Sequence, residues 1–367
     1  MKTTQNRLKS LLKIPLFALL FLGITSFGSA TPERSLFGLP FIFDEIDGKT
    51  ATFPDELKNP STANDLKVFW WNIRDGAYWS HQLQDQAKKA GDPNAKSPLD
   101  ENLKTLALSS NPPEVILLGE FELSCLEKDT DDLFAKLYPY QLYVPDSKDH
   151  LGIGIQIYSA YPFETASELL DWSPYYATTE KQEAFKKEWA EKVKDGGERF
   201  YDRSFSDLKI KKGDKLWHVL PVHLLNNWSP LAAQIGKEGA GITLLFGTNN
   251  PHYRQVERLV DEKIAPILDS NSKNVNLLLI GDFNLPDELF GIMPVAYRLL
   301  SNHLQSAFQT YGTPFTFPAV NTDMSSVRRM TIDHAFTSEA VETLSRAVIP
   351  LTGSDHYPIE VHLHEND

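Results

Sequence analysis

Eight short apolar runs, rich in β-branched and aromatic residues, set the strongest limit on how this chain can fold. They cover residues 67–72, 115–120, 141–145, 153–159, 216–223, 276–282, 331–337 and 357–364. Runs of this length and composition are typical of β-strands. Helical patterns separate only some of them, at residues 99–109, 131–138 and 253–268. Because strands and helices do not alternate one for one, the pattern favours two sheets faced by helices over a Rossmann fold.

The N-terminus has the order of a secretory signal. Basic residues precede an apolar run at residues 14–22, and small residues follow at 28–30. The apolar run is shorter than the ~20 residues that cross a bilayer. We therefore expect residues 1–30 to be a signal peptide and the protein to be exported, either to a periplasm or as a secreted protein. An uncleaved N-terminal anchor is the alternative; after cleavage, no integral membrane domain is expected.

The rest of the chain predicts one large domain after a short lead-in. Residues 31–65 contain four prolines and little periodicity, which is typical of an irregular segment. We expect a single decorated domain over residues 66–367. An insertion is expected around 165–215, where a stretch at 178–194 rich in Lys and Glu predicts a solvated helix.

Cysteine content and charge restrict the chemistry. The single cysteine, Cys125, allows no intramolecular disulfide, so stability must come from the apolar core. No neighbouring feature suggests an activated thiol, and a small apolar filler is the favoured interpretation. The formal net charge of −13 disfavours a broadly basic surface. A nucleic-acid partner would therefore need a local patch or a bound metal.

The strongest chemical signal is an apolar run that ends in Gly-Asp-Phe-Asn at residues 281–284. Strand alternation places Asp282 and Asn284 on the same side, and the end of a buried strand would hold both on rigid backbone. Gly281 would allow close approach, and Pro286 would end the strand. Two such side chains can hold a water molecule and aim it at phosphorus. The alternative is a structural Asp-x-Asn turn at a strand end.

A second signal is the pair Asp355 and His356, which leads directly into an alternating apolar segment. Adjacent side chains point in different directions, so the two residues would have different roles. Asp355 is a candidate metal ligand, and His356 is a candidate contact to a phosphoryl oxygen. A loop detail without a chemical role is the alternative for either segment alone. Their joint presence favours a hydrolytic site.

Six short motifs make the chain resemble the endonuclease/exonuclease/phosphatase superfamily, whose order of motifs they follow. They are Trp-Asn-Ile at 71–73, Leu-Gly-Glu at 118–120, Val-His-Leu at 222–224, Gly-Asp-Phe-Asn at 281–284, Ile-Asp at 332–333 and Ser-Asp-His at 354–356. The resemblance extends from residue 67 to residue 361. It implies an α+β, deoxyribonuclease I-like fold in which two packed, mostly antiparallel β-sheets are flanked by helices in four layers.

The resemblance also implies a metal site on this fold. Glu120 would be the principal metal carboxylate, with Asn72 and Asp355 nearby. Mg²⁺ is the expected cofactor because these ligands are rich in oxygen, and Mn²⁺ or Ca²⁺ are the alternatives.

Five further residues receive catalytic roles by the same resemblance. Asp282 would orient or deprotonate the attacking water, and Asn284 would hold water or phosphate by hydrogen bonding. His356 would stabilise charge on the phosphoryl oxygens, with its ring held by Asp333. His223 would protonate the leaving oxygen or stabilise charge, and the sequence does not assign an acidic partner to it.

Departures from the family's pattern bear on the substrate. Arg74 stands where apurinic-type DNA repair members carry Asp, which disfavours that branch. Glu122 stands where the pancreatic deoxyribonuclease branch carries Arg, which removes one expected DNA contact. An apolar membrane-docking hairpin, as in sphingomyelinase relatives, has candidates only in Trp228 and residues 172–176.

We expect an exported, metal-dependent phosphoester hydrolase, with a nuclease-like phosphodiesterase favoured narrowly. A phosphoester substrate is the expected partner, with a nucleic acid and a lipid head group as the candidates. The alternative is a phosphatase or a phospholipase C-type enzyme that acts on a lipid head group or a small phosphoester. A further alternative, of another class, is a non-catalytic binding domain that keeps the fold.

Overall fold

The described part of the chain lies within one unit, Ala51–Asp367. The computed structural model describes residues 62, 64–145, 153–166, 206–224, 251–270, 275–287, 293–308, 316–317 and 331–366. Several predictions fall outside these residues: the signal peptide at 1–30, nearly all of the lead-in, the helix at 178–194, and the aromatic candidates at 172–176 and 228.

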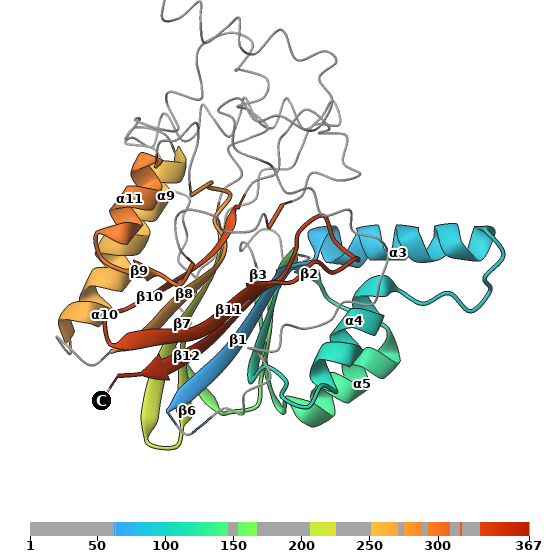
Figure 1. Ribbon diagram of the computed structural model, residues 1–367, viewed down its shortest axis with the longest axis horizontal. Helices are drawn as coiled ribbons and strands as arrows, with labels where there is room; N and C mark the ends of the chain where they lie inside the picture. Colours follow the sequence, from blue (N-terminus) through green and yellow to red (C-terminus); the bar gives the residue numbers. More distant parts are fainter. Residues whose placement is uncertain are drawn as a thin grey trace, which may run out of the picture. The chain divides into compact units, whose positions relative to one another are not determined.

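The strands form two six-stranded sheets (Figure 1). The first sheet has the order β11 (Val341–Val348), β12 (Ile359–Glu365), β1 (Asp65–Asn72), β2 (Val115–Glu122), β4 (Ile153–Ser159), β3 (Tyr140–Pro145). The second has the order β5 (Phe163–Ala166), β6 (Asp207–Lys212), β7 (Lys215–His223), β8 (Asn276–Asp282), β10 (Asp333–Thr337), β9 (Gln305–Ser306). Among the described strands, only β1 with β2 and β7 with β8 pair in parallel. Both sheets are therefore mostly antiparallel, as predicted.

Strand alternation sorts the apolar side chains between two layers. In β1, Leu66, Val68 and Trp70 belong to a core that also contains residues of the second sheet, such as Val219 and Leu278. This core fills the space between the sheets. Phe69 and Trp71, on the other face of β1, belong to a different core that includes residues of the helices outside the first sheet. A β-strand buried on both faces reads as a continuous apolar run, which explains why β1 is visible in the sequence.

Helices cover the outer face of each sheet (Figure 1). The first sheet carries α3 (Arg74–Lys89), α4 (Pro98–Ala107) and α5 (Lys128–Leu137). The second carries α9 (Pro251–Leu259), the π-helical turn η2 (Val260–Ile264), α10 (Ala265–Ser270) and α11 (Val295–Ser301). The four-layer, deoxyribonuclease I-like arrangement expected from the sequence is confirmed.

Each of the eight apolar runs contains a strand, and the three helical patterns coincide with α4, α5 and the α9–α10 segment. Most of the insertion predicted around residues 165–215 lies outside the described residues, and the structure describes only its two ends. Residues 207–212 form β6, which is hydrogen-bonded to β5 and β7 within the second sheet. The alternation in β6 places Lys side chains between apolar ones, and these charges obscured the strand. No helix among the described residues is long and apolar enough to cross a membrane.

Candidate active site

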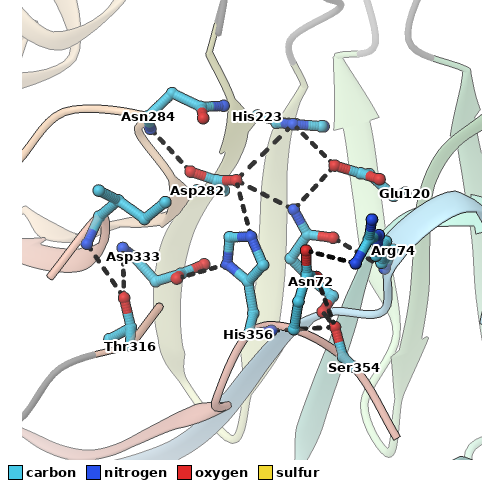
Figure 2. A network of polar contacts seen from close by, with 12 residues as sticks. Asn72, Arg74, Glu120, His223, Asp282, Asn284, Thr316, Asp333, Ser354 and His356 are labelled. Carbon is cyan, nitrogen blue, oxygen red and sulfur yellow. Dashed lines mark hydrogen bonds and ion pairs between the residues drawn. The ribbon is translucent and has the colours of Figure 1, made fainter. Parts of the chain in front are cut away.

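The candidate site lies where strand ends from both sheets meet (Figure 2). Parallel strands end at the same edge of a sheet, so β1 with β2 and β7 with β8 bring their carboxyl ends together. The antiparallel strands β10 and β12 begin at this edge. The side chains that result are Asn72, Glu120, His223, Asp282, Asp333 and His356.

Asn72 joins the two sheets across the site. Its Nδ2 donates to Glu120 Oε1 and to Asp282 Oδ2, each at 3.0 Å. Its Oδ1 accepts from the backbone N of Arg74 at 3.0 Å. Asn72 is fully buried, so these contacts fix the relative positions of two carboxylates from different sheets.

Asp282 lies at the centre of the group. Its Oδ2 is 3.8 Å from His223 Nε2 and 3.9 Å from His356 Nε2, in addition to the contact with Asn72 (Figure 2). Glu120 Oε1 is 3.5 Å from the same His223 nitrogen. Glu120 and Asp282 are therefore the acidic neighbours of His223, which the sequence left unassigned. One carboxylate oxygen faces two imidazoles and an amide in a water-poor setting.

His356 is oriented by a buried chain of hydrogen bonds. Its Nδ1 donates to Asp333 Oδ2 at 2.8 Å, and Trp70 Nε1 donates to the other oxygen of Asp333 at 2.9 Å. The Thr316 hydroxyl accepts from the backbone N of Asp333 at 3.0 Å. Burial alone lowers the pKa of His356, but the Asp333 carboxylate outweighs it and raises this pKa. The His356 ring is therefore held as a cation with Nε2 toward Asp282.

Three residues of the site have left-handed backbone conformations, which cost about 1–3 kcal/mol for residues other than glycine. They are Arg74 at φ 51°, Glu120 at φ 54° and Asn284 at φ 47°. At Glu120 the pairing of β2 with β4 shifts register, as a bulge does. Gly281 has φ 156°, and a Cβ there would lie 1.8 Å from the carbonyl oxygen of Val222. The backbone conformation at these positions sets the directions of the Glu120 and Asn284 side chains, and that of Asp282, which follows Gly281.

Asp355 lies beside Arg74, with 3.2 Å between Asp355 Oδ2 and Arg74 Nη1. Burial raises the pKa of Asp355. The preceding Ser354 fixes this corner, because its hydroxyl donates to the carbonyl oxygen of Asn72 at 2.6 Å and accepts from the backbone N of His356 at 3.2 Å. The structure thus places a protein cation against one of the predicted metal ligands.

The donor set fits a divalent cation. Glu120, His223 and Asp282 present ligand atoms within 4.8 Å of one another, and so do Asp282, Asp333 and His356. Burial raises the pKa of Asp282, and the nearby Asp333 carboxylate raises it further. Several carboxylates therefore converge with too little positive charge. Of the three predicted metal ligands, Asn72 and Glu120 are in contact, but Asn72 faces the carboxylates with its amide nitrogen and not with its oxygen.

Several residues of the site were not singled out from the sequence. Trp70 and Thr316 bind Asp333, Ser354 bridges two motifs, and two buried histidines, His252 and His334, contact the segment that carries Asn284. Two of them had a local signal, because Ser354 stands within the Ser-Asp-His motif and His334 directly follows the Ile-Asp motif. The others depend on contacts between distant parts of the sequence.

The chain belongs to the endonuclease/exonuclease/phosphatase family. The sequence matches this family over residues 69–356, which is more than half of the chain and contains every residue of the site just described. Members of this family generally hydrolyse phosphoester bonds. No curated protein matches the sequence.

Solved structures support the fold independently. An endonuclease/exonuclease/phosphatase from Beutenbergia cavernae DSM 12333 is 16% identical, with a TM-score of 0.51 over 83% of this chain and 72% of that one. A family protein from Bacteroides thetaiotaomicron is 17% identical, with a TM-score of 0.50 over 83% of this chain and 98% of that one. At these identities the likeness establishes the fold, and the chemistry has to be argued from the site.

Proposed function

We propose that this chain is an exported, divalent-metal-dependent phosphodiesterase that cleaves its substrate by direct attack of water on phosphorus. The observation that carries the proposal is the convergence on Asp282 Oδ2 of Asn72, His223 and His356, each within 3.9 Å. The family's general chemistry, hydrolysis of phosphoesters, is consistent with such a site.

Asp282 is suited to hold and activate the water. Its Oδ1 accepts from the backbone N of Asn284 at 2.7 Å, which leaves Oδ2 directed into the site. The Asp282 side chain is 2% exposed, so a water molecule bound to Oδ2 would be shielded from bulk solvent. A carboxylate in this position accepts a hydrogen bond from the water and can take its proton as the bond to phosphorus forms.

Two histidines provide for the charge that develops on the substrate. The cationic His356, anchored by Asp333, directs Nε2 into the site and can donate to a phosphoryl oxygen. His223 and His356 lie on opposite sides of Asp282 (Figure 2), and from its side His223 can donate to the leaving oxygen. Asn284 is proposed to position water or phosphate. Each assignment uses a group that is already held in place before substrate binds.

Asn72, Glu120 and Asp355 are proposed to hold the divalent cation, with Mg²⁺ the expected ion and Mn²⁺ or Ca²⁺ the alternatives. A bound divalent ion would supply Lewis-acid stabilisation of negative charge on the phosphoryl group. Asn72 would contact such an ion through Oδ1, which requires its amide to turn, and Arg74 would have to release Asp355. The converging carboxylates favour both changes.

One observation supports a second candidate for the substrate. Glu122 is exposed at the end of β2, two residues beyond Glu120, and the chain has a formal net charge of −13. A long polyanion such as a nucleic acid would be repelled at this edge of the site. A phosphatase or phospholipase C-type activity on a lipid head group or small phosphoester is therefore the second candidate.

The test is hydrolysis by the purified chain of plasmid DNA, RNA, sphingomyelin, phosphoinositides and bis-(p-nitrophenyl) phosphate, each with Mg²⁺ and with chelator. Asp282→Asn serves as the matched control, because it preserves shape and removes the carboxylate. We expect metal-dependent cleavage of a phosphodiester that this variant lacks. Cleavage of sphingomyelin or phosphoinositides without cleavage of DNA or RNA would favour the second candidate. No metal-dependent turnover of any substrate would leave a non-catalytic domain.

A further inference from the structure

We propose that His252 and His334 are positioning residues that hold Asn284 in its left-handed conformation. They would thereby fix the active-site loop, residues 283–285, which follows β8. The inference rests on the proposed function of Asn284. Neither histidine reaches the centre of the site, and both act through the backbone on either side of Asn284.

The two histidines bind the two carbonyl groups that flank Asn284. His252 Nε2 donates to the carbonyl oxygen of Phe283, and His334 Nε2 donates to that of Leu285, each at 2.7 Å. The histidines come from different elements, the start of α9 and β10. The Phe283 carbonyl belongs to the peptide group before Asn284 and the Leu285 carbonyl to the one after Leu285, so the two bonds restrict the dihedral angles of Asn284 and Leu285.

Asn284 needs such support. Its φ of 47° lies in a region that non-glycine residues occupy at a cost, although asparagine tolerates it better than most. Its backbone N donates to Asp282 Oδ1 at 2.7 Å, so a rotation at Asn284 would also disturb the proposed water-binding carboxylate. Its Nδ2 donates to the carbonyl oxygen of Leu224 at 3.0 Å. Through the bond from the Asn284 backbone N to Asp282 Oδ1, a loop held by the two histidines also holds the Asp282 carboxylate in place.

Both imidazoles are suited to a fixed, neutral hydrogen bond. His252 and His334 are 1% and 2% exposed, and burial lowers the pKa of each to about 4. A neutral imidazole has a single N–H, and the bond to a carbonyl oxygen places that proton on Nε2 in both residues. The donors therefore stay in the same state through the neutral range.

Packing alone does not account for a histidine at position 334. Its ring makes edge contacts with Phe283 and Tyr297, at centroid distances of 5.4 Å and 5.2 Å, and lies 6.0 Å from the ring of Phe336. A phenylalanine would fill this aromatic pocket without the cost of burying a polar ring. The imidazole differs from phenylalanine by its N–H donor, and that donor binds the loop.

The decisive experiment separates ring packing from hydrogen bonding. His334→Phe keeps the ring and removes the donor, whereas His334→Gln keeps a donor; His252→Met and His252→Gln form the second pair. His218→Gln is the control, because His218 lies on β7 away from the site and pairs with Asp207. Hydrolysis of bis-(p-nitrophenyl) phosphate with Mg²⁺ gives kcat and KM, and hydrogen exchange at the Asn284 amide is measured on the metal-free chain.

We expect His334→Phe and His252→Met to lower kcat about tenfold or more with little change in KM, and to speed exchange at Asn284. The Gln variants and the control should stay close to wild type. Unchanged kcat and unchanged Asn284 exchange in the donor-free variants would overturn the proposal. If wild type hydrolyses no phosphoester, the proposed function fails, and exchange at Asn284 alone decides whether the histidines hold the loop.

Discussion

Charged side chains are buried at both ends of strand β1, and the two groups differ in their balance of charge. At the carboxyl end, the site cluster contains four carboxylates against Arg74 and two histidines. At the amino end, a far-end cluster contains three carboxylates, two lysines and two histidines. Its members are Asp65, Lys67, Glu114, Lys212, Glu360, His362 and His364.

The far-end cluster pairs its charges closely. Lys212 Nζ lies 2.7 Å from Glu114 Oε1 and donates to the carbonyl oxygen of Asp65 at 2.6 Å. Lys67 Nζ lies 3.7 Å from Glu360 Oε1 and donates to the carbonyl oxygen of Asn111 at 3.2 Å. Each lysine thus offsets a carboxylate. In the site cluster, by contrast, carboxylates lie beside one another and an added cation would be favourable.

The difference separates charges that maintain the fold from charges that are arranged for a ligand. A buried pair mainly avoids the cost of an unpartnered charge. A buried excess of one sign stays costly until a partner arrives, and this is typical of a binding or catalytic site. Neutralising one charge should therefore have opposite consequences at the two ends.

The largest effect is expected from Asp282→Asn in the site cluster. We expect kcat to fall by about two to four orders of magnitude, because the carboxylate that takes the proton is lost. The metal-free variant should unfold at the same temperature as wild type or higher, because a repelling carboxylate has been removed. Steady-state kinetics and thermal unfolding measure the two effects. Retained turnover would refute the role of Asp282.

The next effect is expected at the far end, from Lys67→Met. Lys67 is fully buried, so removing its ammonium leaves Glu360 without its cation, and we expect a loss of about 3–5 kcal/mol in the free energy of unfolding. Turnover per folded molecule should not change. Urea unfolding provides the measurement.

Lys128→Met is the matched control for Lys67→Met. Lys128 also pairs with a carboxylate, Asp132, but the two side chains are 84% and 66% exposed. Little change in stability is expected. Equal losses in the two lysine variants would show that burial does not distinguish the far-end cluster from an ordinary surface pair.

Metal binding should be changed in opposite directions by Glu120→Ala and Arg74→Met. Metal at a hundredfold excess over its Kd would stabilise the chain by roughly 2.7 kcal/mol. Glu120→Ala should remove most of this stabilisation. Arg74→Met should produce the same stabilisation at a lower metal concentration, because the cation beside Asp355 is gone. Thermal unfolding with increasing Mg²⁺ or Mn²⁺ tests both. Identical metal dependence in the two variants would contradict this arrangement.

The sequence predicted eight of the twelve described strands and missed β5, β6, β9 and β11, of which β5, β9 and β11 lie at sheet edges. In β11, the exposed Glu342, Leu344 and Arg346 alternate with less exposed residues that include Thr343 and Ser345, and β9 has only two residues. The helix α3 begins with Arg-Asp-Gly, which carries no helix-start signal. Edge strands and short elements are fixed by their neighbours in the fold, so a local pattern contains little information about them.

The eight site residues predicted from short motifs come together, and the expected contact between Asp333 and the His356 ring is present, but the contacts with residues outside these eight were not predicted. Trp70 binds Asp333 across 263 positions, and His252 reaches Phe283 from another element. A motif records which side chain stands at a strand end. It does not record which distant donor satisfies the carbonyl or carboxylate beside it, because that depends on the packing of the two sheets.

The smallest effect concerns pH and the neutral histidines near the site. Burial lowers the pKa of His252 from 6.5 to about 4, so between these values the unfolded chain takes up a proton that the folded chain does not. Stability attributable to His252 is complete above pH 6.5 and is lost as pH falls toward 4, by roughly 1–2 kcal/mol at pH 5. His252→Gln keeps a donor but cannot become charged. Its free energy of unfolding should therefore fall less steeply than that of wild type from pH 6.5 to 5, and parallel curves would mean that His252 is charged in the folded chain.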